Sequence, residues 1–70
     1  MKIWLHRPQG RIVQLRWYNF TYDLYKLLLE IQAKCPNQAI EIVGDGITTA
    51  YVPIHLLNLE NYHMLRRLNV

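Results

Sequence analysis

The sequence contains no serine and only one cysteine, and these two shortages limit the chemistry that the chain can support. A single cysteine cannot form a disulfide within the chain, and a free thiol favours a reducing compartment, which we take to be the cytoplasm. Without serine, a nucleophile would have to be Cys35 or a threonine. Cys35 precedes Pro36 at the expected C-terminal end of a helix, where the helix dipole disfavours a thiolate. We therefore predict that the protein is not an enzyme.

Metal ligands and paired acids are also scarce. His6, His55 and His63 lie apart in the sequence, without the short spacing of a zinc ligand pair. The segment Gly44–Gly46 holds two glycines, but a β-prone run rather than a helix N-terminus follows it, which argues against a phosphate-binding loop. The five acidic residues show no close pairing. We predict no catalytic residue, no metal site and no cofactor.

The length and the charge of the chain define a small and mildly basic protein. Seventy residues are enough for one domain, residues 1–70, with a single small core. Eight lysines and arginines against five acids give a net charge of +3, which favours anionic partners only weakly. No apolar run is long enough to span a membrane, and the polar stretch 6–11 is unlike a signal peptide. We expect no membrane association.

Residues 1–17 predict a β-hairpin with a defined register. Pro8 and Gly10 suit a three-residue loop, because proline presets its φ and glycine supplies the left-handed residue. The loop pairs Arg7 with Arg11, Leu5 with Val13, Ile3 with Leu15, and Met1 with Trp17. One face is then apolar, and we expect its middle residues to be buried, namely Leu5, Val13 and Leu15. The other face carries Lys2, Trp4, His6, Ile12, Gln14 and Arg16.

Residues 21–34 predict a helix. Asn19 or Thr21 can cap its N-terminus, Asp23 suits its first turn, and Pro36 ends it near Cys35. An apolar stripe recurs at helical spacing and consists of Leu24, Leu27, Leu28 and Ile31. We expect this stripe to pack on the apolar face of the first hairpin. Three tyrosines are expected at the edge of the core, namely Tyr18, Tyr22 and Tyr25.

Two β-prone runs, residues 39–43 and 47–52, predict a second hairpin that ends at Pro53. Two registers are open: a two-residue turn at Asp45-Gly46 pairs Ile42 with Thr49, and a three-residue loop pairs Val43 with Ile47. The sequence alone does not decide between these two registers.

The tail from Ile54 to Val70 allows two interpretations, of which we favour a helix. One face of that helix would carry Leu57, Asn61, Met64, Leu65 and Leu68. The alternative is a turn at residues 56–59 followed by a strand with Met64, Leu68 and Val70 on one side. The predicted fold class is therefore α+β, a small ββαββ domain with a C-terminal helix or strand.

The first hairpin resembles the opening of ubiquitin and its β-grasp relatives. The residues that carry the similarity are Met1, Ile3, Trp4, Leu5, Gly10, Val13 and Leu15. The resemblance implies a β-grasp-like fold and the binding of partners through an exposed sheet face. Conjugated members of the family end in Gly-Gly, whereas this sequence ends in Arg-Arg-Leu-Asn-Val. Activity as a covalent modifier is therefore not expected.

The outer face and the turn of the first hairpin form the candidate binding site. Its residues are Lys2, Trp4, His6, Arg7, Arg11, Ile12 and Arg16. An exposed tryptophan among cations can anchor a protein partner or stack on a nucleic-acid base. We predict a protein-interaction module, a small adaptor or inhibitor, because the basic residues are few and scattered. The alternatives are a nucleic-acid-binding protein and a structural homo-oligomeric subunit, and we expect a homodimer with Trp4 in or near the contact.

Overall fold

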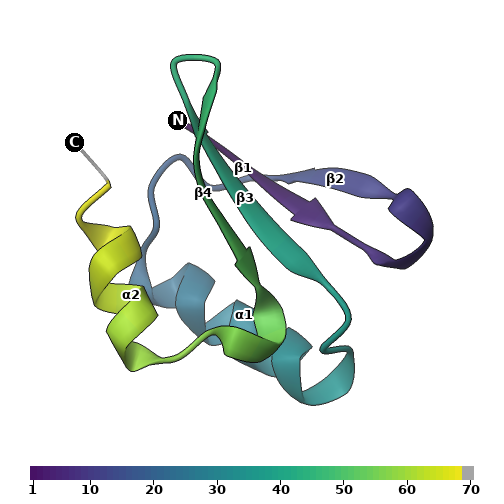
Figure 1. The fold of residues 1–70 in the computed structure, drawn as a ribbon. Helices are drawn as coiled ribbons and strands as arrows, with labels where there is room; N and C mark the ends of the chain where they lie inside the picture. Colours follow the sequence, from purple (N-terminus) through teal and green to yellow (C-terminus); the bar gives the residue numbers. More distant parts are fainter. Residues whose placement is uncertain (69–70) are drawn as a thin grey trace.

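The computed structural model describes residues 1–68 and shows a four-stranded antiparallel sheet with two α-helices (Figure 1). The elements are β1 (Lys2–His6), β2 (Ile12–Leu15), α1 (Tyr22–Lys34), β3 (Ala39–Gly44), β4 (Ile47–Pro53) and α2 (Leu59–Arg66). Two short 3-10 turns, η1 (Pro8–Gly10) and η2 (Ile54–Leu56), follow β1 and β4. The strand order is β2-β1-β3-β4, so the two hairpins join through β1 and β3. The predicted α+β class is confirmed.

The register of the first hairpin is confirmed. Ile3 pairs with Leu15 and Leu5 with Val13. The turn closes through a hydrogen bond of 2.7 Å from the Arg7 N–H to the Arg11 carbonyl. Gly10 has the left-handed φ that the loop requires, at 76°. Gln9 has a positive φ as well, which the sequence pattern did not indicate.

One expectation for this hairpin is wrong, because β2 lies at the edge of the sheet. Ile3 and Leu5 of the inner strand β1 are buried, as expected for Leu5. Val13 remains 36% exposed and Leu15 is only half-buried. The turn that joins β1 to β2 projects beyond both helices (Figure 1), so β2 lacks a helix over much of its inner face. An edge strand has a neighbouring strand on one side only. The alternation of residue types in a sequence cannot show that a strand will lie at the edge of its sheet.

Helix α1 begins and ends as its sequence predicts. The Thr21 hydroxyl, rather than Asn19, accepts the capping hydrogen bond from the Leu24 N–H at 3.4 Å. Cys35 follows the last turn as the C-cap and is exposed. Leu24 and Leu28 are fully buried against the sheet, in one cluster with Ile3 and Leu5. The predicted packing of the helix on the first hairpin is therefore confirmed, although Leu27 and Ile31 are only partly buried.

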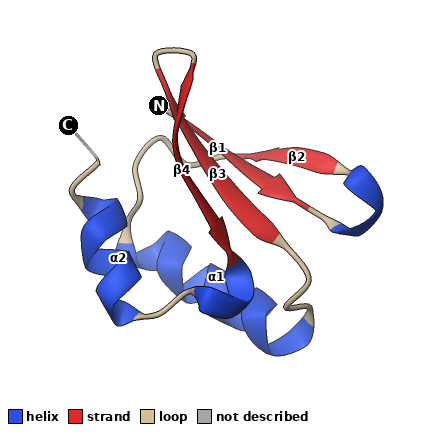
Figure 2. Ribbon diagram, viewed as in Figure 1, coloured by secondary structure: helices blue, strands red, loops and turns tan. Residues whose placement is uncertain are grey.

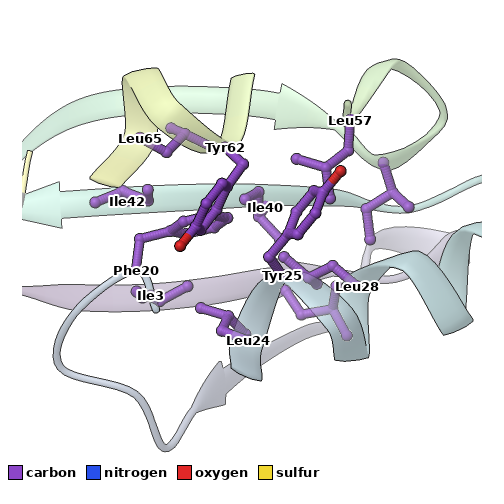
Figure 3. Packing of buried hydrophobic residues seen from close by; sticks show 12 residues of the cluster. Ile3, Phe20, Leu24, Tyr25, Leu28, Ile40, Ile42, Leu57, Tyr62 and Leu65 are labelled. Atoms are coloured by element: carbon purple, nitrogen blue, oxygen red, sulfur yellow. The ribbon is translucent and has the colours of Figure 1, made fainter. Parts of the chain in front are cut away.

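Three aromatic residues complete the core, and none of them was placed there by the sequence pattern. Tyr25 of α1, Tyr62 of α2 and Phe20 of the connecting loop are buried (Figure 3). Tyr25 was expected only at the edge of the core, whereas Tyr18 and Tyr22 are exposed. The Tyr62 ring lies 4.8 Å from that of Tyr25 and 6.2 Å from that of Phe20, measured between centroids. The aromatic cluster therefore joins the two helices.

Neither register considered for the second hairpin holds throughout. Asp45 and Gly46 form a two-residue turn with positive φ at both residues, and Gly44 pairs with Ile47. A β-bulge then shifts the ladder, so that Ile42 pairs with Ala50 instead of Thr49. Pro53 was expected to interrupt the ladder after Val52, but it pairs with Ala39 as the last residue of β4.

The tail forms a helix, which confirms the favoured interpretation for the described residues. The Asn58 side chain caps α2 by accepting from the Asn61 N–H at 2.8 Å. Leu57 and Leu65 are buried, but Met64 is exposed, so its expected place on the inner face is wrong. Tyr62 takes the place on the core side of α2 that was expected for Met64. The helix has only eight residues, and the face that it turns to the core is narrow. Val70, which the alternative strand included, lies outside the described residues.

Candidate binding surface on the sheet

Both helices pack on one face of the sheet and leave the other face without a helix (Figure 2). The side chains of Ile3, Leu5, Ile40 and Ile42 point to the helices, since all four belong to the core cluster. The alternate residues of each strand therefore point away from the helices. We call this second surface the open face; it comprises Lys2, Trp4, His6, Ile12, Gln14, Ala39, Glu41, Val43, Thr48, Tyr51 and Pro53. Neither helix of residues 1–68 covers it.

A row of four residues crosses the middle of the open face, one from each strand. Trp4 of β1 pairs with Gln14 of β2 on one side and with Glu41 of β3 on the other, and Glu41 pairs with Tyr51 of β4. Trp4 is half-buried, and Tyr51 is 57% exposed. Ile12 lies in the next row and is 53% exposed. The open face thus presents the side chains of Ile12 and Tyr51 to solvent, and that of Trp4 in part.

A hydrogen-bonded network surrounds the carboxylate of Glu41. The Thr48 hydroxyl donates to Glu41 Oε2 at 2.5 Å, and His6 Nε2 lies 2.9 Å from Glu41 Oε1. These hydrogen bonds, first from Thr48 and then from His6, hold the pKa of Glu41 below its ordinary value of 4.5. The His6 ring also meets the Tyr51 ring edge-on, with 5.2 Å between centroids. The network fixes the orientation of the side chains on β1, β3 and β4 and engages both oxygens of the only acid on the open face.

The structure brings together some, but not all, of the site residues that the sequence selected. Lys2, Trp4, His6 and Ile12 share the open face as predicted. Arg16 lies just beyond the end of β2, so the ladder does not place it opposite Lys2. Arg7 and Arg11 flank the turn, and all four cations of the hairpin, Lys2, Arg7, Arg11 and Arg16, are exposed.

The sequence analysis missed all the residues that the second hairpin contributes to this surface, among them Glu41, Thr48 and Tyr51. They lie on the second hairpin, more than thirty residues from Trp4, and only the pairing of β1 with β3 brings the hairpins side by side. Alternation along residues 39–43 would have placed the side chain of Glu41 on the other face of its own strand from the buried isoleucines. No local signal showed which strand would lie next to β1.

A hollow of about 320 Å³ continues the open face at the end of β1. Three segments that are distant in the sequence form it: the end of β1, the loop between α1 and β3, and the end of β4 with η2. Its lining residues are His6, Arg7, Pro36, Asn37, Gln38, Ala39, Tyr51, Pro53 and His55. Open-face residues from three strands thus also line the hollow.

Comparisons with known proteins do not assign the site. No family model, no curated protein and no solved structure matches the chain. The ubiquitin-like resemblance of the first hairpin therefore stays a prediction. Within residues 1–68, no group of three or more His, Cys, Asp or Glu side chains is placed to hold a metal ion. None of the helices described is long and apolar enough to cross a membrane.

Proposed function

We propose that this protein is a non-enzymatic interaction module, a small adaptor or inhibitor, that binds a protein partner through its open face. The observation that carries the proposal is the central row of the sheet, where Trp4 and Tyr51 flank Glu41 on a face that neither helix covers. Tryptophan and tyrosine supply a large contact area and lose little conformational freedom on binding, and they dominate the energetics of many protein interfaces. Ile12 of the edge strand β2 adds an exposed aliphatic side chain to the same face.

The scaffold supports binding without rearrangement. Trp4 lies on an inner strand, hydrogen-bonded on both sides by β2 and β3. The network around Glu41 restrains His6 and Tyr51 in the same way. Side chains that are already ordered lose less conformational entropy when a partner binds. A domain of this size would act by occupying a surface of a larger protein, and its exposed free thiol at Cys35 is consistent with a cytoplasmic setting.

Single-stranded nucleic acid is the second candidate partner, because stacking aromatic residues among cations also suit its bases and phosphates. Lys2 belongs to the open face, and Arg7, Arg11 and Arg16 lie at the ends of the first hairpin on one side of it. Glu41 lies at the centre of the face, however, beside Trp4, where an anionic backbone would meet its carboxylate. We therefore favour protein. A structural subunit that associates with its own copies is the third candidate, and sedimentation distinguishes it.

The test begins with capture of a partner from the native host and its purification, followed by titration against three variants. Trp4→Ala and Tyr51→Ala remove the two aromatic side chains, and each is expected to weaken the complex by about tenfold or more. Tyr18→Ala is the matched control, because Tyr18 is exposed but does not belong to the open face. Its affinity should stay within about twofold of wild type. Equal losses in all three variants, or tight binding of a generic oligonucleotide at physiological salt, would reject the proposal.

A further inference from the structure

We infer that the hollow beside the open face seats an acidic side chain of an extended peptide segment of the partner. This inference rests on the proposed function and specifies the chemistry of its partner. The hollow has a volume of about 320 Å³, within the range of ligand-binding clefts. Because His6, Tyr51 and Pro53 belong both to the open face and to the hollow, a segment that covers Tyr51 reaches the hollow directly.

The charge of the lining selects an anion. Arg7 lines the hollow, and its guanidinium offers five N–H donors in the planar arrangement that pairs with a carboxylate. Five more side chains with N–H or O–H groups line it, those of His6, Asn37, Gln38, Tyr51 and His55. No acidic residue is among the lining residues; Glu41 keeps its charge, but it lies outside the lining, and Thr48 and His6 engage both of its oxygens. The C-terminal end of α1 precedes Pro36, and its partial negative charge is countered by Lys34 in the last turn.

A buried amide at the hollow distinguishes a peptide from a simple anion. Gln38 is 92% buried, and its Oε1 atom has no hydrogen-bond partner among the residues described. Its Nε2 donates to the Cys35 carbonyl at 3.3 Å, a long hydrogen bond. An unpaired buried acceptor is costly and needs an explanation. If the amide turns toward the hollow, Oε1 can accept a backbone N–H of a bound peptide, whereas a phosphodiester offers the site only acceptors.

The two requirements together describe one occupant. Arg7 requires an acceptor with negative charge, and Gln38 requires a donor. A glutamate or aspartate within a polypeptide carries both groups a few bonds apart. A phosphodiester satisfies Arg7 alone. An acidic protein segment is therefore the partner that fits the lining of the hollow.

The experiment titrates the protein with a blocked peptide and follows the NMR signals of the residues at the hollow. The probe is acetyl-Ala-Ala-Glu-Ala-Ala-amide, and the control probe has glutamine in place of glutamate. We expect saturable shifts of the Arg7 side-chain N–H and the Tyr51 ring in the millimolar range, as befits one anchored side chain. The glutamine peptide should bind about tenfold more weakly, because its acceptor is neutral and the hydrogen bond to Arg7 then joins one charged group instead of two.

Two pairs of variants and two further probes decide the outcome. Arg7→Gln should weaken the glutamate peptide by about tenfold, whereas Arg11→Gln, an exposed arginine outside the hollow, should change it by less than about twofold. Gln38→Met, which keeps the side-chain volume but removes the acceptor, should also weaken binding of the glutamate peptide, whereas Asn19→Ala should not.

Equal effects of Arg7→Gln and Arg11→Gln, or no saturable shift, would overturn the inference. Tighter binding of inorganic phosphate or of decathymidine to the same residues would overturn it as well and assign the hollow to phosphate.

The failure of this inference can be told apart from that of the proposed function. The peptide titration reports on the hollow alone, whereas Trp4→Ala is measured with the complete partner. If Trp4→Ala abolishes partner binding while Arg7→Gln has no effect on peptide or partner, the open face is the interface and the hollow is not part of it. If the peptide binds as described but Trp4→Ala leaves partner binding unchanged, the proposed function fails.

Discussion

The ring of Tyr62 in α2 stacks on the ring of Tyr25 in α1, with 4.8 Å between centroids and 28° between planes. The two residues lie 37 positions apart, and each is the innermost aromatic residue of its helix. The contact is reinforced at η2, where the Gln32 side chain donates to the carbonyls of Ile54 and Leu57, each at 2.9 Å. The C-terminal helix is therefore part of the core and not an appendage to it.

The first prediction follows from this contact. Tyr62→Ala should lower the free energy of unfolding by about 3–5 kcal/mol, the range for removing a buried aromatic side chain. Met64→Ala, on the exposed side of the same helix, should change it by less than about 0.5 kcal/mol. Urea unfolding followed by circular dichroism measures both. A small effect of Tyr62→Ala would show that α2 is not anchored to the core.

The second prediction concerns the packing of α1. Leu28 is fully buried against the sheet, so Leu28→Ala should destabilise the fold by about 2–5 kcal/mol through a cavity. Leu59→Ala is the matched control, because Leu59 opens α2 and is exposed. It should cost less than about 1 kcal/mol in the same urea titration. Similar losses in the two variants would contradict the described packing.

The third prediction concerns pH. Because the pKa of Glu41 is lower in the folded state than its ordinary value of 4.5, the folded protein binds the proton more weakly than the unfolded chain. The stability gained from this difference is complete above the unfolded pKa and is lost as the pH falls through the folded pKa. Thr48→Val removes the larger cause of the shift, so its urea midpoint should fall less steeply than that of wild type as the pH drops below about 4.5.

Thr49→Val provides the control for this measurement. Thr49 is the next residue on β4 and is also exposed to solvent. Its hydroxyl donates to the Ile47 carbonyl and not to Glu41. Its pH dependence should match that of wild type. A wild-type slope in Thr48→Val would show that the hydroxyl does not stabilise the carboxylate.

The fourth prediction concerns the unpaired oxygen of Gln38. Gln38→Met preserves the volume and removes a buried acceptor without a partner, at the expense of one long hydrogen bond to Cys35. We expect the free energy of unfolding to rise by up to about 1 kcal/mol. Thermal unfolding measures it. A loss of more than about 1 kcal/mol would mean that the amide stabilises the free protein, which removes the reason to assign it to a ligand.

The fifth prediction concerns self-association. The open face of a second copy would cover the exposed side chains of Ile12 and Tyr51 and the half-buried Trp4, so we expect a homodimer at high micromolar concentration. Trp4→Ala should shift the sedimentation mass toward that of the monomer. A wild-type monomer under these conditions rejects the dimer and leaves the face free for another protein.

Local rules were sufficient for the first hairpin and for α1. The loop Pro8–Gly10 needs one proline and one glycine at definite positions, and it alone sets which residues of β1 and β2 face each other. The stop at Pro36 likewise acts within a few residues of the helix end, and local capping rules limited the start of the helix to Asn19 or Thr21. These features depend on neighbours in the sequence, and the sequence therefore determined them by itself.

The open face depended on the tertiary structure. With the two-residue turn at Asp45-Gly46 and an uninterrupted ladder, Tyr51 would pair with Ile40 and point into the core. The bulge moves it opposite Glu41, beside His6 and on the same surface as Trp4. The same shift turns Ala50 and Val52 toward the core, where both are partly buried. The bulge is favoured because it buries the apolar side chains of Ala50 and Val52 and leaves the Tyr51 hydroxyl in water. This gain in burial exists only when the helices cover the core face of the sheet.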